Sequence, residues 1–145
     1  MKRPIYFVTR HHKDNFFHLL HKTANPKASH LVASTYILGA IGTLDDSPGQ
    51  IVNIEPHVGT GGIDFATILN KLKPDREGSS LAQLAANLFD GKNPADVTEV
   101  FSPLGDEYQA VAYQALLVKY PSFSKSWESR FDYEDYERRQ ARTSK

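Results

Sequence analysis

Four polar side chains near the N-terminus have the spacing of a metal-binding helix face. The four residues are His11, Asp14, His18 and His21, and we call them the histidine stripe. They are separated by three, four and three residues. On a helix they lie within about 80° of arc, so imidazole and carboxylate groups could converge on one divalent ion. Further ligands would come from elsewhere, and the available ones are His30, Glu55 and His57. A solvated polar face has the same pattern and is the interpretation we favour, so we expect no bound cofactor, with a divalent metal as the alternative.

A glycine-rich segment stands before a predicted helix. It reads Val58-Gly59-Thr60-Gly61-Gly62. Backbone N–H groups of such a turn, followed by a helix N-terminus, can hold an anion, which makes residues 59–62 the candidate anion-binding residues. Neither complete phosphate motif is present, because Gly-Lys-Ser/Thr is missing and the spacing is not G-x-G-x-x-G. A flexible loop ahead of a helix is the simpler interpretation.

Side chains of the types used in catalysis are present, but no motif arranges them. The chain has no cysteine, which excludes a cysteine nucleophile, a zinc ribbon, an iron–sulfur cluster and a disulfide framework. The serines, histidines and acids do not form a nucleophile elbow or another recognisable signature. The candidate residues outside the stripe are Ser29, His30, Ser34, Asp45, Asp46, Glu55 and His57. We therefore assign no catalytic residue and favour a non-enzymatic protein.

The apolar pattern predicts an all-α, single-domain bundle of six or seven helices with at most one short strand pair. Residues 28–41 are apolar on every side, which is typical of a buried helix, so we place this helix at the centre. The segment 43–62 is predicted to be a loop, with little extended structure at Ile51, Val52 and Ile54. The other helices are expected at 14–23, 63–72, 81–89, 94–101, 105–120 and 123–136. Residues 1–136 should form the domain and 137–145 a frayed tail.

Charge is balanced over the whole chain but not along it. The sequence has 17 basic and 17 acidic side chains. Residues 1–30 carry six basic groups and one acidic group, net +5, while residues 31–121 are net −6 and residues 122–145 are net +1. The balance excludes a globally basic nucleic-acid binder but leaves a local basic face open. Apolar runs are too short for a membrane span or a signal peptide, so we expect a cytoplasmic protein.

The C-terminal region carries aromatic side chains among charged ones. They are Trp127, Phe131, Tyr133 and Tyr136. Such a pattern is common on a terminal helix that docks on its own domain, which we favour, and on a homodimer interface, which is the alternative. This segment is therefore the candidate contact for a protein partner or for self-association.

Residues 6–20 read YFVTRHHKDNFFHLL, with a histidine, then Asn-Phe, then leucines. This segment resembles the start of small uncharacterised proteins of Gram-positive bacteria and their phages. Residues 84–91 (LAANLFDG) and 111–120 resemble later helices, so the similarity covers about a third of the chain. It implies an all-helical domain of unknown function and structural roles for His12 and Asn15 in fixing the first helix. It implies no activity or cofactor.

These observations favour a non-enzymatic helical protein that acts through protein–protein interaction or homo-oligomerisation. One alternative is a metal- or anion-binding enzyme that uses the histidine stripe or the loop from Glu55 to Gly62. The second alternative is a nucleic-acid-binding accessory protein that uses the basic residues of 1–30, although a solvated surface is the simpler interpretation of those residues.

Overall fold

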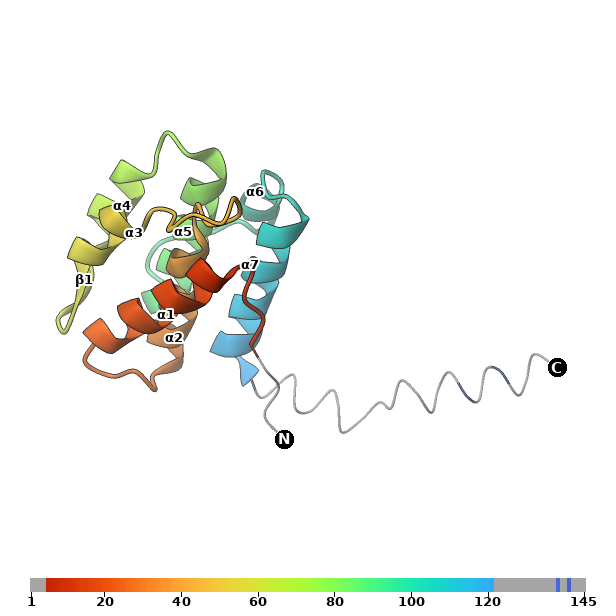
Figure 1. Cartoon of the computed structure of the whole chain (residues 1–145), viewed down its shortest axis with the longest axis horizontal. Coiled ribbons are helices and arrows are strands. Elements are labelled where there is room, and N and C mark those ends of the chain that lie inside the picture. Colours follow the sequence, from red (N-terminus) through yellow and green to blue (C-terminus); the bar gives the residue numbers. More distant parts are fainter. Residues whose placement is uncertain (1–4, 122–137, 139–140, 142–145) are drawn as a thin grey trace.

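The computed structural model describes residues 5–121, 138 and 141. Within them, the chain forms seven α-helices, one 3₁₀ helix and one antiparallel pair of strands (Figure 1), which confirms the predicted all-α bundle. In chain order the elements are α1 (Arg10–Lys22), α2 (Ser29–Ala40), α3 (Ile51–Ile54), η1 (Glu55–His57), β1 (Val58–Gly59), β2 (Gly62–Ile63), α4 (Phe65–Lys71), α5 (Arg76–Asp90), α6 (Val97–Phe101) and α7 (Asp106–Lys119). No helix in this part of the chain combines the length and apolar character needed to cross a membrane.

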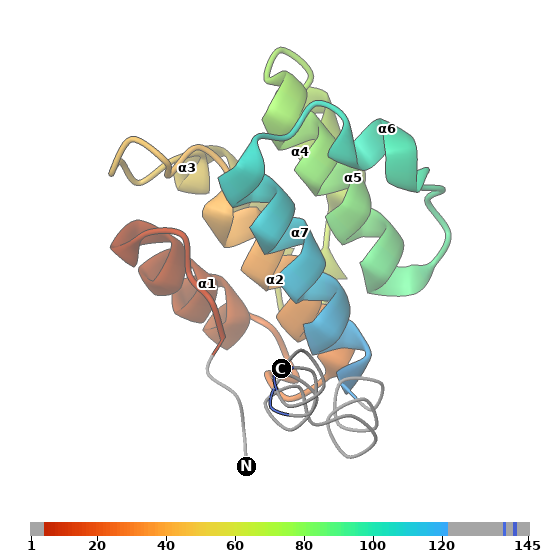
Figure 2. The same cartoon turned by 90° about the vertical axis from the view of Figure 1, so that its right-hand side faces the viewer.

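Helix α2 is the centre of the bundle, as its apolar composition predicts. Nine of its twelve residues are buried. Helices α1, α5 and α7 pack around it (Figure 2), and the side chains of Tyr36 and Ile37 are completely enclosed. The hydroxyl of Ser34 donates a hydrogen bond of 3.0 Å to the carbonyl of Ala85 on α5, so a buried polar group is satisfied at this contact.

Helix starts are set by capping side chains rather than by the first apolar residue. Helix α1 begins at Arg10, four residues before the predicted start, because the Thr9 hydroxyl accepts the backbone N–H of His12 at 3.1 Å. The predicted start of α5 at residue 81 is also late. The carboxylate of Asp75 accepts the N–H of Gly78 at 3.0 Å and starts the helix at Arg76.

The same rule shortens α6. The predicted start at Pro94 is wrong, because the Asp96 carboxylate accepts the backbone N–H groups of Thr98 and Glu99 and places the first helical residue at Val97.

The predicted loop 43–62 contains α3, η1, β1 and the first residue of β2. Ile51, Val52 and Ile54, which were expected to be extended at most, form α3, because one helical turn brings Ile54 into the core with 1% of its surface exposed. A 3₁₀ turn follows, and then a hairpin pairs β1 with β2. Because the hairpin includes residue 63, α4 begins at Phe65 rather than at 63.

The predicted C-terminal contact lies outside the described residues. This holds for the expected helix 123–136 and for its four aromatic residues Trp127, Phe131, Tyr133 and Tyr136. Of the expected tail 137–145, only residues 138 and 141 are described. Both predictions therefore remain predictions.

Candidate functional site

One face of α1 packs against the segment that connects α2 to α4. The Nε2 atom of His11 lies 3.7 Å from an Asp46 carboxylate oxygen, and the Nε2 atom of His18 lies 3.0 Å from Oε1 of Glu55. Lys22 donates a 2.6 Å hydrogen bond from its Nζ to the backbone carbonyl of Glu55. Two histidines of the predicted metal stripe are therefore paired with acids of the connecting segment.

The Glu55 carboxylate is the centre of this surface cluster. The hydrogen bond from His18, and then the charges of His18 and Lys22, hold the pKa of this carboxyl below its ordinary value. The partners are well exposed, with 42% of the Glu55 side chain and 54% of the His18 side chain accessible, so solvent screens the attraction. The cluster aligns α1 with α3 and η1 more than it stabilises the fold.

The rest of the stripe points elsewhere. The ring of His21 stacks on Phe17, with centroids 6.4 Å apart, and Asp14 is exposed. Among residues 5–121, 138 and 141, no group of three or more histidine or acidic side chains is placed to hold a metal ion. In this part of the chain the stripe is thus divided between ion pairs and an aromatic contact.

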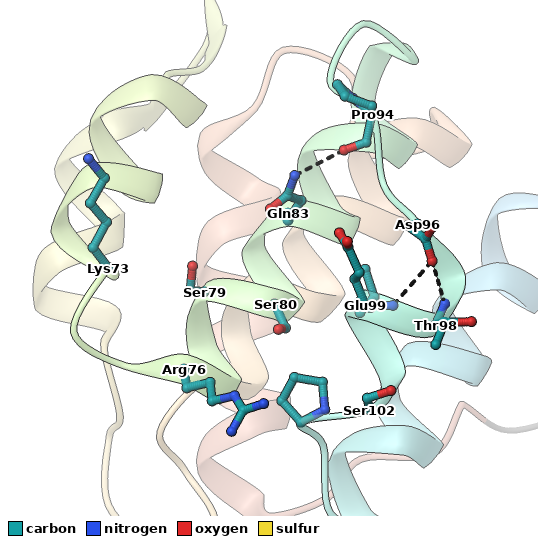
Figure 3. Close-up of a pocket in the computed structure, with 12 residues that line it drawn as sticks. Lys73, Arg76, Ser79, Ser80, Gln83, Pro94, Asp96, Thr98, Glu99 and Ser102 are labelled. Carbon is teal, nitrogen blue, oxygen red and sulfur yellow. Dashed lines mark hydrogen bonds between the residues drawn. The ribbon is translucent and has the colours of Figure 1, made fainter.

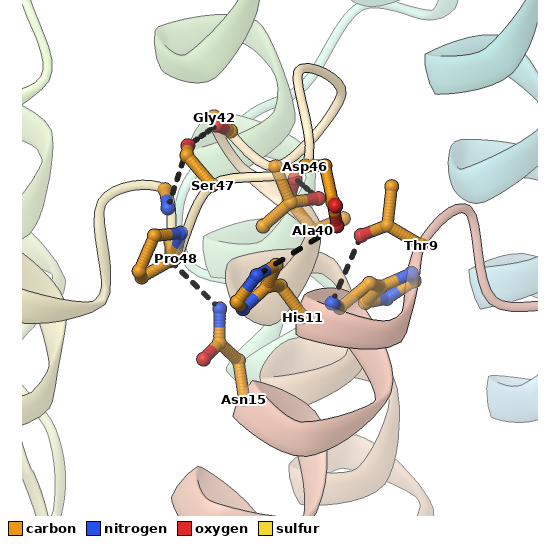
Figure 4. A network of polar contacts seen from close by, with 11 residues as sticks. Thr9, His11, Asn15, Ala40, Gly42, Asp46, Ser47 and Pro48 are labelled. Atoms are coloured by element: carbon orange, nitrogen blue, oxygen red, sulfur yellow. Dashed lines mark hydrogen bonds and ion pairs between the residues drawn. The ribbon is translucent and has the colours of Figure 1, made fainter.

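Asn15 joins three segments of the fold at one buried side chain (Figure 4). Its Nδ2 donates to the carbonyl of Gly39 at 3.1 Å, near the end of α2. It also donates to the carbonyl of Pro48 at 3.0 Å, which is the contact drawn in Figure 4. The helices cross closely here, because a Cβ on Gly39 would lie 2.9 Å from the backbone nitrogen of Phe16. One amide therefore satisfies a carbonyl that the helix end leaves unpaired and also fixes the connecting loop.

We expect Asn15→Ala to lower the free energy of unfolding by about 2 kcal/mol, because two shielded carbonyls lose their donor. Urea unfolding measures this difference. Asn15→Asp keeps the shape but cannot donate when ionised, so it should be at least as unstable. Asp14→Ala, at the exposed neighbouring position, is the control and should change stability little. An Asn15→Asp variant as stable as the wild type would contradict the assigned role.

His12 is a buried structural residue rather than a member of a site. It is fully enclosed, and its ring contacts Phe7 and Tyr36 with centroids 5.1 and 4.6 Å away. Its Nε2–H donates to the carbonyl of Tyr36 at 2.8 Å, and its Nδ1 accepts the N–H of Val8 at 3.1 Å. Burial lowers the pKa of His12 to about 4, against a smaller opposing effect of the Tyr36 carbonyl. A neutral ring thus connects the N-terminal segment, α1 and α2.

The glycine-rich segment forms the turn of the β1–β2 hairpin. Gly59 pairs with Gly62, so Thr60 and Gly61 are the two central turn residues, and Gly62 has a φ of +120° that favours glycine. The N-terminus of α4 that follows is capped by Asp64. Its carboxylate accepts the backbone N–H of Thr67 at 3.2 Å and the hydroxyl at 2.7 Å.

These two hydrogen bonds engage the N–H and the hydroxyl of Thr67, so neither donor at the α4 N-terminus is available to a ligand. The Thr67 hydroxyl, followed by its N–H, lowers the pKa of the Asp64 carboxyl. The protein's own carboxylate therefore occupies the position where an anion was expected beside residues 59–62.

Histidines and serines from the catalytic hypothesis are not paired in the described part of the chain. Ser34 is buried and bonded to a backbone carbonyl, and His30 packs against the ring of Phe89 at 5.6 Å. The Nε2 atom of His57 is buried without a hydrogen-bond partner among the described residues. No hydrogen bond there joins a serine hydroxyl to an imidazole, so the arrangement does not resemble an activated nucleophile.

A polar pocket of about 670 Å³ lies between α5 and α6 (Figure 3). Lys73 and Arg76 stand on one side and Asp96 and Glu99 on the other, as Figure 3 shows. The remaining lining residues are mostly hydroxyl-bearing or small, namely Ser79, Ser80, Gln83, Pro94, Thr98, Val100, Ser102 and Pro103. The Asp96 carboxylate is already engaged as the α6 cap, so this wall has a structural role.

The outer side of α7 carries a row of residues that the sequence analysis did not identify. Its inner side buries Tyr108, Val111, Ala112 and Ala115. Tyr113 and Tyr120 are 60% and 59% exposed on the other side. Together with their neighbours at spacings of four, three, four and three they form what we call the outer seam: Asp106, Ala110, Tyr113, Leu117 and Tyr120. In Figure 2, α7 is the foremost helix, with α2 behind it.

The signal for the outer seam is present in the sequence. Two apolar sets lie on opposite sides of this helix, but the sequence analysis predicted only the helix 105–120 and gave no role to the second set. Only the packing of α7 on α2 shows which set remains exposed.

The chain has no match in three comparisons with known proteins. No protein-family model, no curated protein and no solved structure is similar to it. The fold class and the outer seam are therefore the basis for a functional proposal, and the resemblance to small helical proteins of Gram-positive bacteria and phages stays a prediction.

Proposed function

We propose that the protein is a non-enzymatic, cytoplasmic helical protein that acts by binding a partner helix on the outer seam of α7. The observation that supports this proposal is the pair of apolar sides on α7, of which only one packs on α2 and α5. Apolar side chains on a second side of a helix are typical of a helix that is covered on that side too. Exposed tyrosines suit an interface, because the ring becomes buried while the hydroxyl can stay hydrated.

The spacing of the seam specifies the kind of partner. Positions that alternate by three and four residues are the a and d positions of a heptad, which receive the side chains of another helix. Ala110 lets the two backbones approach, and Tyr113 and Leu117 supply the apolar contact. The partner is therefore an amphipathic helix with its own apolar row, docked in the helix-to-helix mode.

A photo-crosslinking amino acid at position 113 tests this contact in cells that produce the full chain. We expect covalent adducts from position 113 and none from position 52, because Val52 lies on α3 and is 76% exposed without belonging to the seam. Leu117→Lys should reduce the adduct yield at least tenfold, because it places a charge in the apolar contact.

The control is the Val97→Lys variant, which places the same charge on a 72% exposed valine of α6. It should leave the adduct yield unchanged. Equal yields from positions 113 and 52, or adducts that persist in the Leu117→Lys variant, would show that the seam is not the contact.

A further inference from the structure

We propose that the polar pocket between α5 and α6 binds a short peptide whose N-terminal ammonium and C-terminal carboxylate are both free. The pocket has a volume of about 670 Å³, and none of its lining residues lies on α7. The site is therefore separate from the outer seam, and this inference goes beyond the proposed function. It is carried by the polar faces and the charges of the two helices that form the pocket.

One wall of the pocket is a polar face of α5. Its residues occupy positions i, i+3, i+4 and i+7, so they share one side of the helix: Arg76, Ser79, Ser80 and Gln83. The buried leucines of α5 lie on its other side, toward the core. The polar face is turned toward α6, as Figure 3 shows. The two helices therefore enclose a cavity with polar walls on this side, where apolar side chains would interdigitate in an ordinary helix contact.

The two walls carry charges of opposite sign. Lys73 and Arg76 stand on the α5 side, and Asp96 and Glu99 stand on the α6 side. The ion pairs found among residues 5–121 connect α1 to the segment between α2 and α4, so none of them joins these walls. Asp96 is bonded to the start of α6, but no hydrogen bond or ion pair in this range engages the Arg76 guanidinium or the Glu99 carboxylate. A cation and an anion thus stand apart on opposite sides of one cavity.

These charges favour a ligand that has both signs. A purely anionic ligand such as inorganic phosphate would be attracted by the cationic wall but repelled by the acidic wall, and the reverse holds for a purely cationic ligand. A free peptide has a carboxylate at one end, which suits the planar fork of the Arg76 guanidinium. It has an ammonium at the other end, which suits the Glu99 carboxylate.

The hydroxyl groups and the size of the pocket suit the rest of a peptide. The side chains of Ser79 and Ser80 are half-buried in the pocket wall, and their hydroxyls form no hydrogen bond within residues 5–121. A hydroxyl can donate to a peptide carbonyl and accept from a peptide N–H. The volume lies within the range of small-molecule sites, about 300–1,000 Å³. A short peptide combines this size with a charge at each end.

A nuclear magnetic resonance titration of the full ¹⁵N-labelled chain with trialanine tests the inference. Trialanine should shift the amide signals of Ser79, Ser80 and Glu99 and leave that of Tyr113 on the outer seam in place. Acetyl-trialanine lacks the ammonium and trialanine amide lacks the carboxylate. Each should bind about fivefold more weakly than trialanine, because each loses one solvent-exposed ion pair. Inorganic phosphate should not shift these signals.

Two variants assign the ends of the peptide to the two walls. Arg76→Gln should weaken trialanine about fivefold but should bind trialanine amide as the wild type does, because the carboxylate that it would contact is already missing. Glu99→Gln should behave in the same way toward acetyl-trialanine. Lys92→Gln and Glu107→Gln remove the same charges at exposed positions outside the pocket and are the matched controls. Both should bind trialanine as the wild type does, and circular dichroism should show equal helix content in all four variants.

Three results would overturn the inference. The first is a set of pocket signals that trialanine does not shift or that phosphate shifts as much. The second is that the two blocked peptides bind the wild type as tightly as the free peptide. The third is that the control variants weaken trialanine as much as Arg76→Gln and Glu99→Gln do, since the effect would then come from net charge rather than from the pocket.

Discussion

The Gly49→Ala variant is expected to lose about 3 kcal/mol of the free energy of unfolding. Gly49 has a φ of +69°, a left-handed conformation that costs an alanine about 1 kcal/mol. A Cβ at this position would overlap the carbonyl oxygen of Ile41 and lie 2.9 Å from the Cγ2 atom of Thr43. That carbonyl accepts the N–H of Gln50, so a shift that makes room for the methyl group also breaks the loop closure. Overpacking of this kind adds about 2 kcal/mol.

The matched control is Gly91→Ala at the end of α5. Gly91 has a similar φ of +73°, but a Cβ there would meet nothing within 4 Å. The Gly91→Ala variant should therefore lose only about 1 kcal/mol of the free energy of unfolding, which is the cost of the left-handed conformation for alanine. Urea unfolding of both variants measures the difference, which corresponds to a midpoint shift of about 1 M between them. Equal losses would mean that the crowding around Gly49 relaxes and that the loop is not tightly closed.

The central helix shows how much of the fold the sequence predicts by itself. Its expected bounds, 28–41, differ by one residue at each end from those observed. The signal is local, because a run of apolar and small residues on every side of a helix has one stable location, the interior. For α5 the same signal gives the correct face but a late start, because the capping role of Asp75 is a matter of backbone geometry.

The connection between α2 and α4 shows where sequence reasoning stops. Four residues of α3 are too few for apolar periodicity to separate a helix from a strand. The contacts that fix this connection come from α1, with Asn15 bonded to Pro48 and Lys22 bonded to Glu55, both 33 residues away in sequence. Side-chain to backbone contacts at such separation leave no pattern within one segment.

The side chains of the histidine stripe lie apart in the described structure for a related reason. The spacing correctly placed His11 and His18 on one side of α1, and the sequence also offered Glu55 as a nearby acid. Two acids reach this side from different points of the connecting segment, so each histidine has its own partner. A pattern along one helix predicts which side chains share a face, but the opposing segment determines whether they converge.

Acid is expected to destabilise the protein through His12 over a defined range of pH. In the unfolded chain the imidazole has its ordinary pKa of about 6.5, whereas burial lowers the pKa of His12 to about 4 in the folded protein. The full stabilisation is present above pH 6.5. As the pH falls from 6.5 to 4, the unfolded state binds a proton that the native state does not, so the free energy of unfolding decreases by about 1.4 kcal/mol per pH unit. The loss reaches about 3 kcal/mol near pH 4.

The hydrogen bonds of the ring explain why protonation is resisted. Nε2–H donates to the Tyr36 carbonyl, which cannot act as a donor, so Nδ1 must be the acceptor for Val8. A second ring proton would sit on Nδ1 and face the Val8 N–H, which replaces a hydrogen bond with two opposed donors. The N-terminal segment before α1 should therefore detach first in acid, and hydrogen exchange at Val8 reports this step.

Urea unfolding between pH 7 and pH 4.5 measures how steeply the free energy of unfolding changes with pH. The His12→Gln variant shows whether this slope comes from His12. The His12→Gln variant is expected to be less stable than the wild type at pH 7. Its free energy of unfolding should nevertheless fall less steeply with pH, because glutamine binds no proton in this range. His21→Gln removes an exposed imidazole instead and should keep the wild-type slope. The comparison depends on slopes, so a lower starting stability of His12→Gln does not affect it. Identical slopes in the wild type and His12→Gln would mean that the ring is protonated in the folded protein and that its enclosure by Phe7 and Tyr36 is incomplete.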